Sequence, residues 1–219
     1  MNKNVLVGCP TSFHKEYCLQ QYAEAVKNLT YKDYDVILVD NSPDDAYLKK
    51  IKSLGLNAMK GPYHEGARDR IIASRNILKE YAIKNNYSYL LSLEQDVIPP
   101  LDIIERLLAH EKKVISGIYF ARNIIGNEKM LIPLAYVELP ARNELPSMRP
   151  LNESELFHSK GLIKIISCGL GCILIHKSIL KEINFRYDLN TFDDRWFCID
   201  LYNKKIPIYC DASVKCKHM

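Results

Sequence analysis

The sequence lacks an apolar run long enough to cross a bilayer. The apolar stretch at its start ends at Pro10, which makes it too short for the core of a signal peptide. The most apolar later stretch, from Leu162 to Ile175, contains Lys164 and two glycines and is also too short to span a membrane. We therefore expect a cytoplasmic protein without a transmembrane segment, and peripheral association with a membrane stays open.

The sequence also lacks a strong charge of one sign. Lys and Arg together number 30 and Asp and Glu number 26, so the net charge is only +4. No basic stripe with interleaved aromatic residues is present, and we expect no nucleic-acid partner.

Cysteine patterns typical of zinc sites or disulfide frameworks are missing as well. The chain has seven cysteines, an odd number, and none of them forms a Cys-x-x-Cys motif. We expect them to be small buried hydrophobic residues, because free cysteine is among the most buried residue types. A zinc site or a disulfide framework is the alternative.

The chain of 219 residues is long enough for one sizeable domain. A strand, a helix and another strand come first, and this order predicts a parallel sheet with right-handed crossovers. We predict an α/β fold, with a mostly parallel central sheet flanked by helices and a small antiparallel addition. Strands are expected at 4–8, 35–39, 57–60, 89–93, 114–120, 131–138, 162–167, 172–176 and 206–210. Helices are expected at 16–28, 45–53, 68–84, 101–109, 177–182 and 195–203.

The segment from Ala121 to Lys160 differs in character from the rest of the chain. Four prolines interrupt it, and only Leu131 to Glu138 has a strand pattern. Long irregular segments in compact domains are usually functional or mobile. We therefore expect this segment to be irregular and to form the acceptor side of a site or a lid over it.

The stretch from Tyr89 to Pro100 holds the strongest functional signal. A buried strand, Tyr89 to Leu93, is followed at once by two carboxylates, Glu94 and Asp96. Ligands bind at the carboxyl ends of strands in open α/β sheets. Two acids that lie this close repel each other unless a cation lies between them, and a divalent metal carrying a phosphate is the natural ligand. A solvated acidic turn is the alternative.

Four other residues indicate a function only when they are considered together with this acidic pair. Asp40 follows a strand, Asp193 and Asp194 precede a helix, and His218 lies near the end of the chain. Taken singly, Asp40 is equally well a turn or cap residue, and the two later acids suit a helix N-terminus. A penultimate histidine is most simply a tail residue.

The order and spacing of these motifs resemble a GT-A fold glycosyltransferase of family 2, over nearly the whole chain. The motifs that carry the resemblance are Val5–Thr11, Val39–Ser42, Ser74–Asn76, Leu93–Asp96, Gly169–Ile175, Asp193–Cys198, and Ile208–Asp211 followed by His218. Two of them depart from the family pattern. Glu94 opens the Asp-x-Asp signature, and Asp193 takes the place of the usual first Glu.

The resemblance implies one GT-A (Rossmann-like) domain over residues 1–219, with a nucleotide-binding half, 1–100, and an acceptor-binding half, 101–219. It assigns Asp194 as the general base, with Asp193 beside it, and Trp196 and Arg122 to the acceptor. The metal, Mn²⁺ or Mg²⁺, is assigned to Glu94, Asp96 and His218. The donor-binding residues are Pro10, Thr11, Asp40, Asn41, Arg75, Gln95, Gly169 and Gly171.

The expected activity is metal-dependent transfer of a sugar from a UDP- or GDP-sugar to an acceptor hydroxyl, with inversion. The acceptor is a saccharide, a lipid-linked molecule or a protein. Mixed oxygen and imidazole ligands suit Mn²⁺ somewhat better than Mg²⁺. Bound metal neutralises the leaving diphosphate, so a single carboxylate suffices as base.

Other functions stay open at this point. A retaining enzyme of the same fold uses the same acids differently, and a binding protein that has lost catalysis is a non-enzyme alternative. A sugar nucleotidyltransferase needs a Gly-rich basic loop after the first strand, and a haloacid-dehalogenase-like phosphohydrolase needs an Asp there; Cys9–Phe13 offers neither. Trp196 could instead anchor its helix, and Arg122, Arg142 and Arg149 could be solvated arginines.

Overall fold

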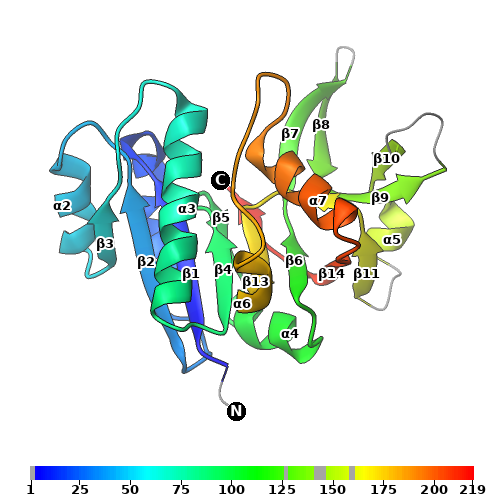
Figure 1. Ribbon diagram of the computed structural model, residues 1–219, viewed down its shortest axis with the longest axis horizontal. Coiled ribbons are helices and arrows are strands. Elements are labelled where there is room, and N and C mark those ends of the chain that lie inside the picture. The colour runs from blue at the N-terminus through cyan, green and yellow to red at the C-terminus, as the bar shows by residue number, and fades with distance from the viewer. Residues whose placement is uncertain (1–2, 126–127, 141–146, 158–160) are drawn as a thin grey trace.

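The computed structural model describes residues 3–125, 128–140, 147–157 and 161–219, and its centre is an eight-stranded sheet (Figure 1). In spatial order its strands are β11 (Leu162–Ile165), β14 (Ile208–Lys215), β6 (Val114–Ile118), β13 (Cys172–His176), β4 (Tyr89–Leu93), β1 (Val5–Thr11), β2 (Tyr34–Asp40) and β3 (Asn57–Lys60). β1 to β4 run parallel to one another, and β14 runs parallel to β6. β13 is antiparallel to both of its neighbours, and β11 is antiparallel to β14. The α/β prediction with a mostly parallel sheet is confirmed.

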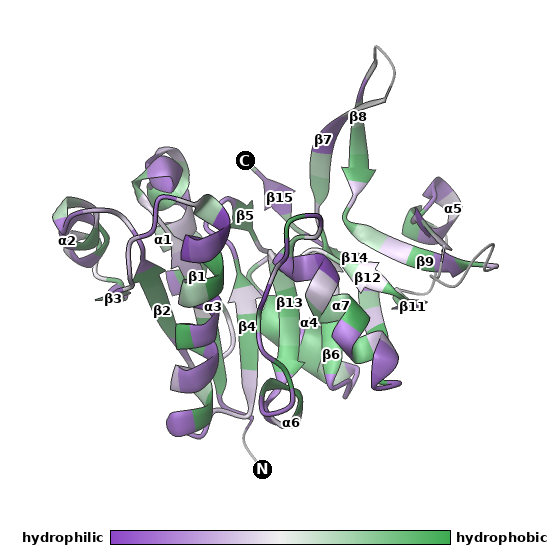
Figure 2. Ribbon diagram, turned by 45° about the horizontal axis from the view of Figure 1, so that its top comes forward, coloured by the Kyte–Doolittle hydropathy of each residue, from purple (hydrophilic) through white to green (hydrophobic). Residues whose placement is uncertain are grey.

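Both faces of this sheet are buried, which explains the continuous apolar runs of its strands. Successive residues of a strand point to opposite faces. Val5 and Val7 accordingly belong to one core cluster, and Leu6 between them belongs to the other. Figure 2 shows mostly hydrophobic strands in the main sheet, whereas α3 and α7 mix hydrophilic and hydrophobic residues.

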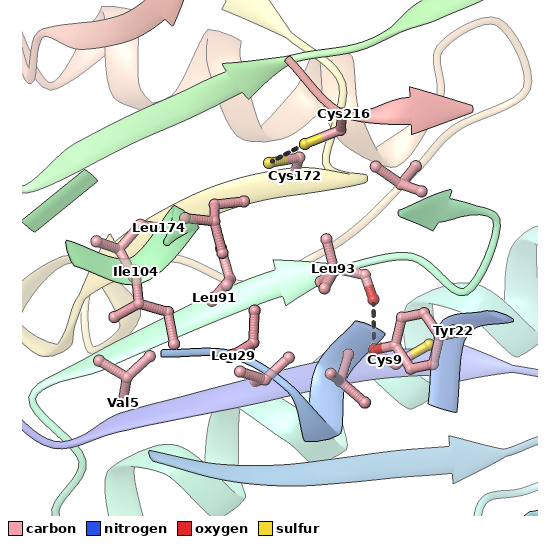
Figure 3. Close-up of a cluster of buried hydrophobic side chains, with 14 of the residues drawn as sticks. Val5, Cys9, Tyr22, Leu29, Leu91, Leu93, Ile104, Cys172, Leu174 and Cys216 are labelled. Atoms are coloured by element: carbon pink, nitrogen blue, oxygen red, sulfur yellow. Dashed lines mark hydrogen bonds between the residues drawn. The ribbon is translucent and has the colours of Figure 1, made fainter. Parts of the chain in front are cut away.

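Helices cover each face of the sheet. One face packs against α3 (Ala67–Lys84), α6 (Lys177–Leu180) and α7 (Asp193–Asn203). The other packs against α1 (Leu19–Lys27), α2 (Ala46–Ser53) and α4 (Ile103–Ala109), and a 3₁₀ helix, η1 (Phe13–Cys18), precedes α1. Figure 3 shows the cluster on this second face, where the Tyr22 hydroxyl donates to the Leu93 carbonyl at 3.2 Å. This bond ties α1 to the end of β4, directly before Glu94.

The described residues also form three small sheets beyond the main one. They are β10–β9–β12 (Ser147–Pro150, Ala135–Leu139, Ser167–Cys168), β15–β5 (Lys217–His218, Val97–Ile98) and β7–β8 (Phe120–Ile125, Glu128–Pro133). A short helix, α5 (Glu153–Phe157), follows β10. The strands of these small sheets pair antiparallel and include the expected antiparallel addition.

The prediction of an irregular segment from Ala121 to Lys160 is wrong for its described residues. Most of them form β7 to β10 and α5. These strands are short and pair with one another or with β12 rather than with the main sheet, and none of them is a long apolar run. Pro133 and Pro150 stand at strand ends, where a missing N–H costs little.

The cysteines and the helices bear on two expectations drawn from composition. All seven cysteines are free and buried, as predicted. The sulfur atoms of Cys172 and Cys216 lie 3.5 Å apart (Figure 3). Within the described ranges, none of the helices combines the length and the apolar character that a membrane crossing requires.

Candidate active site

The carboxyl ends of β1, β2 and β4 meet at one edge of the sheet. Thr11 and Asp40 are register partners there, and β4 runs parallel beside β1 before the chain reaches Glu94. The Gln95 side chain fastens this edge, because its Oε1 accepts hydrogen bonds from the Thr11 hydroxyl and, at 2.9 Å, from the Tyr47 hydroxyl. The two acids of the Asp-x-Asp-like motif are therefore held around a buried amide.

A cavity of about 200 Å³ opens at this edge. It is lined, among others, by Pro10, Thr11, Asn41, Arg70, Glu94 and Gln95. Four predicted donor-binding residues thus share one cavity with one predicted metal ligand. A cavity of about 490 Å³ lies between β11 and the end of α7, but no predicted site residue lines it. The residues that line the smaller cavity, rather than its volume, therefore make it the candidate site.

Asp40 does not line this cavity. Its buried carboxylate accepts hydrogen bonds from the Ser42 amide at 2.9 Å and from the Ser42 hydroxyl, and Lys60 Nζ lies 3.2 Å away. These contacts brace the turn after β2 and present the neighbouring Asn41 to the cavity. A contact between Asp40 and the donor stays a prediction.

Arg75 links two acids that are distant in the sequence. Its guanidinium forms an ion pair with Glu94, and its Nε lies 2.7 Å from Asp193 Oδ2. It also donates to the Ser92 hydroxyl at 2.8 Å. Arg75 is only 4% exposed, so the end of β4 and the start of α7 are joined by a buried charge cluster. Arg75 is absent from the cavity lining, and its predicted contact with the donor stays a prediction.

Residues at the C-terminal end of the chain contact Asp96. Its Oδ2 is paired with Lys15 and lies 3.3 Å from His218 Nε2. The Met219 amide donates to its carbonyl at 2.9 Å, and β15 pairs with β5 immediately after it. His218 is thus a strand residue beside the acidic motif, not a free tail.

The orientation of His218 suits a metal ligand. Its Nδ1 lies 2.8 Å from the Phe120 carbonyl, which can only accept, so this nitrogen carries the proton. In the neutral ring Nε2 then presents a lone pair toward the Asp96 carboxylate. Two facing acceptors need a cation between them or a second proton on the ring.

Asp194 and Asp193 begin α7 and have different surroundings. Asp193 is paired with Arg75, whereas Asp194 accepts a hydrogen bond from the Arg195 amide at 2.7 Å. Burial raises the pKa of Asp194 above its ordinary value, and the neighbouring charge of Asp193 raises that pKa further. The direction agrees with the sequence-based expectation for a general base.

Gly169 and Gly171 pack on a tyrosine from the end of β6. A Cβ added at Gly169 would lie 2.1 Å from the Tyr119 hydroxyl oxygen, and one at Gly171 would lie 2.7 Å from it. The Gly171 amide donates to the same oxygen at 3.0 Å. Close packing accounts for both glycines, and their contact with the donor stays a prediction.

Comparison with known proteins identifies the fold. No protein-family model and no curated protein matches the sequence. Among solved structures, GalNAc-T7 with UDP, GalNAc and Mn²⁺ has a TM-score of 0.69 and 14% identity over 98% of this chain. Residues 1–349 of S. aureus TarS in complex with UDP-GlcNAc have a TM-score of 0.58 and 15% identity over 99% of this chain. A197 from STIV has a TM-score of 0.53 and 16% identity over 99% of this chain. The chain has a GT-A fold.

The likeness covers unequal parts of these proteins. This chain spans 85% of the A197 chain, but only 43% of the GalNAc-T7 chain and 59% of the TarS chain. At these identities the comparison establishes the GT-A fold alone.

A divalent metal would take only part of its coordination shell from this edge of the sheet, and water or the donor would supply the rest. Among the described residues no group of three or more His, Cys, Asp and Glu side chains is placed to bind a metal. However, Asp96 Oδ1 is buried and has no hydrogen-bond partner in the described part of the chain. Asp96 and His218 supply two ligands, and Mg²⁺ or Mn²⁺ with few protein ligands completes its shell with phosphate oxygens and water. Glu94 would join only by leaving Arg75.

The predicted acceptor residues do not meet in one place. Arg186 lies over the Trp196 ring, 3.7 Å from its centroid, which supports the interpretation that Trp196 anchors α7. Arg122 is exposed on β7, and Arg149 forms a bidentate ion pair with Glu155. Arg142 lies outside the described residues.

Sequence reasoning missed three residues that shape the GT-A site. Lys15 pairs with Asp96, Tyr47 holds Gln95, and Tyr119 supports the glycine segment. The spacing of Lys15, four residues beyond Thr11, offered a weak signal. Nothing in the sequence pointed to the two tyrosines, because both contacts join elements far apart in the chain.

Proposed function

We propose that this protein transfers a sugar from a nucleotide diphosphate sugar to an acceptor hydroxyl, with inversion at the anomeric carbon. The observation that carries the proposal is the Arg75 cluster. By joining Glu94 to Asp193, it brings Asp194 to the same edge as the cavity that Thr11, Asn41 and Gln95 line. A donor site and a half-buried carboxylate beside it are what glycosyl transfer requires.

The cavity would receive the nucleotide end of the donor. Its lining offers the Asn41 amide group and the basic side chain of Arg70 beside Thr11. The GT-A relatives GalNAc-T7 and TarS were solved with UDP and UDP-GlcNAc, which supports a UDP-sugar as the first donor to test. The acceptor is a saccharide, a lipid-linked molecule or a protein.

Asp194 acts as the general base. Its carboxylate takes the proton of the acceptor hydroxyl while that oxygen forms a bond to the anomeric carbon. The bond from this carbon to the diphosphate oxygen breaks, and its electron pair leaves with the nucleotide diphosphate. Burial raises the pKa of Asp194 toward the working pH, which favours proton transfer.

Asp96 and His218 are the residues that would hold a divalent cation. Bound there, the cation would neutralise charge on the leaving diphosphate. The unpartnered Asp96 Oδ1 and the acceptor nitrogen of His218 support this assignment. Mn²⁺ and Mg²⁺ are both compatible with it.

Titration calorimetry with UDP and GDP tests donor binding, first with Mn²⁺ and then with a chelator. We expect one nucleotide to bind in Mn²⁺ and to bind much more weakly in the chelator. Equal affinity in both conditions would contradict the metal assignment. Proton NMR of the first product formed then tests the stereochemistry, since retention of the donor configuration contradicts the inverting mechanism.

A second candidate is a nucleotide-sugar-binding protein without catalysis. It is favoured by one observation, that Arg75 engages both Glu94 and Asp193 and so occupies two of the four acids. Saturable donor binding without hydrolysis or transfer over a panel of acceptors would support this candidate over the enzyme.

A further inference from the structure

Lys15 places a cation on the carboxylate that the proposed function assigns to the metal. Its ammonium group forms an ion pair with Asp96 Oδ2. The Asp96 side chain is 6% exposed, whereas the Lys15 side chain is 37% exposed. The ion pair therefore joins a buried, fixed acid to a base that reaches it from the solvent side.

The backbone of Lys15 is held by the acidic motif itself. Gln95 Nε2 donates to the Lys15 carbonyl at 2.5 Å, and the Cys18 thiol donates to the same carbonyl at 3.2 Å. Gln95 is fixed in turn by Thr11 and Tyr47. The main chain at Lys15 is thus rigid relative to Asp96, and only the flexible side chain is left to move.

Carboxylates outnumber basic side chains at this edge, so its charge favours a divalent cation. Four carboxylates, from Glu94, Asp96, Asp193 and Asp194, face two paired cations, Arg75 and Lys15. Arg75 is buried between two acids and cannot leave without exposing both. Lys15 has one acid partner in the salt bridges of the described chain and also lines the donor cavity. It is the cation that can change partner.

We propose that Lys15 is a resident cation on Asp96, which gives up this carboxylate when a divalent metal binds and turns its ammonium group to the donor diphosphate. The inference rests on the proposed function. An ammonium and a divalent ion on one carboxylate repel each other, so Lys15 competes with the metal in the free protein. With the donor present, the same ammonium adds to the charge that binds the diphosphate.

The test measures Mn²⁺ binding to the donor-free protein from the electron paramagnetic resonance signal of free Mn²⁺. Lys15→Met removes the charge and keeps the bulk, and we expect its Mn²⁺ affinity to rise by roughly tenfold or more. Lys15→Gln serves as a second uncharged variant that can still donate to Asp96. Lys15→Arg keeps the charge and is expected to resemble the wild type.

Lys50→Met is the matched control. Lys50 forms a similar ion pair with Glu16, on the same 3₁₀ helix as Lys15, but both side chains are about half exposed and lie outside the donor cavity. Its Mn²⁺ affinity is expected to equal that of the wild type. Circular dichroism confirms the fold of each variant.

A second measurement, UDP binding with saturating Mn²⁺, follows the other half of the proposal. Lys15→Met is expected to weaken this binding by roughly tenfold, because a charge-assisted contact is lost. The proposal is overturned when neither uncharged variant binds donor-free Mn²⁺ more tightly than the wild type, or when UDP binding in Mn²⁺ is unchanged. Failure of the wild type to bind any nucleotide would instead overturn the proposed function, and the donor-free measurement reports on Lys15 in either case.

Discussion

Arg75 Nε lies 2.7 Å from Asp193 Oδ2, a contact that joins α3 to the start of α7 across the edge of the sheet that holds the candidate site. The same guanidinium is paired with Glu94. One buried arginine therefore fixes the positions of Glu94, the first acid of the Asp-x-Asp-like motif, and of Asp193, the acid beside the proposed base. The geometry of the site depends on this residue, although it is not part of the cavity lining.

Replacement of Arg75 is expected to be strongly destabilising. Arg75→Met leaves two carboxylates without their cation at a buried position, and loss of one partner of a buried ion pair costs about 3–5 kcal/mol. Urea denaturation followed by circular dichroism measures the change. The control is Lys204→Met, because Lys204 lies 3.8 Å from Glu182 with both side chains about half exposed and should change stability by less than about 1 kcal/mol.

A double variant separates charge from packing in this cluster. Adding Asp193→Asn to Arg75→Met removes one of the two orphaned charges, so part of the lost stability is expected to return. A double variant as unstable as the sum of the two single ones would show that Arg75 and Asp193 do not interact.

Asp194→Asn is expected to lower the rate of sugar transfer and to leave donor binding nearly intact. The amide keeps the shape of the side chain but cannot accept the proton, so we expect a loss of roughly 10²- to 10⁴-fold in kcat. Transfer is followed by nucleotide release, and donor binding by calorimetry. Asp200→Asn, on the same helix but paired with Arg186 at 2.7 Å, is the control and should keep its activity.

The raised pKa of Asp194 also predicts a dependence of stability on pH. Because burial lifts the pKa of this acid in the folded state above its ordinary value, the folded protein holds the proton more tightly than the unfolded chain. Ionisation of Asp194 therefore lowers stability as the pH rises through the interval between the two pKa values. Asp194→Asn should be more stable than the wild type at about pH 7 and lose this advantage at about pH 3. The urea concentrations at the midpoint of unfolding, measured for both proteins at the two pH values, test this prediction. A variant less stable than the wild type at neutral pH would contradict it.

Much of the fold could be predicted because its strong signals are local. β3 and β4 have the predicted bounds, because Gly61 and Pro62 follow the first directly and the second is an apolar run that ends at Glu94. The helix expected at 16–28 is divided into η1 and α1. The last long strand was predicted to end at Cys210 but continues to Lys215. Its later residues alternate between buried and exposed, a weaker pattern than a continuous apolar run.

The site could be predicted only in part, because the contacts that complete it are not local in the sequence. Motif order located the acids correctly at strand ends and at a helix start. The partners of these acids depend on contacts between distant elements, such as Lys15 with Asp96 or Arg75 with Asp193. No periodicity reports such pairs. The strands of 121–160 escaped prediction because each is short and pairs outside the main sheet.

Alanine at Gly171 is expected to destabilise the site by about 1–3 kcal/mol, the usual cost of forcing extra atoms into a packed core. Its Cβ would lie 2.8 Å from a ring carbon of Tyr119, which cannot move away as a flexible chain end could. Gly66→Ala is the control, because the atom that its Cβ would meet is the mobile carboxylate end of Asp69. Thermal unfolding of both variants checks the difference, and equal melting temperatures would contradict the packing explanation for the glycine.

His218→Ala is expected to weaken UDP binding in Mn²⁺ by roughly tenfold or more, the effect of losing support at a metal site, and to leave binding in a chelator unchanged. The reason is the direction of the ring: Nδ1 is committed to the Phe120 carbonyl, and Nε2 is aimed at Asp96. His110→Ala is the matched control, because His110 also contacts an aspartate, Asp211, at 2.8 Å, but away from the donor cavity. Calorimetry of both variants in both conditions gives four affinities. An equal loss in Mn²⁺ and in chelator would mean that His218 only anchors β15, whereas a loss confined to Mn²⁺ would identify it as a metal ligand.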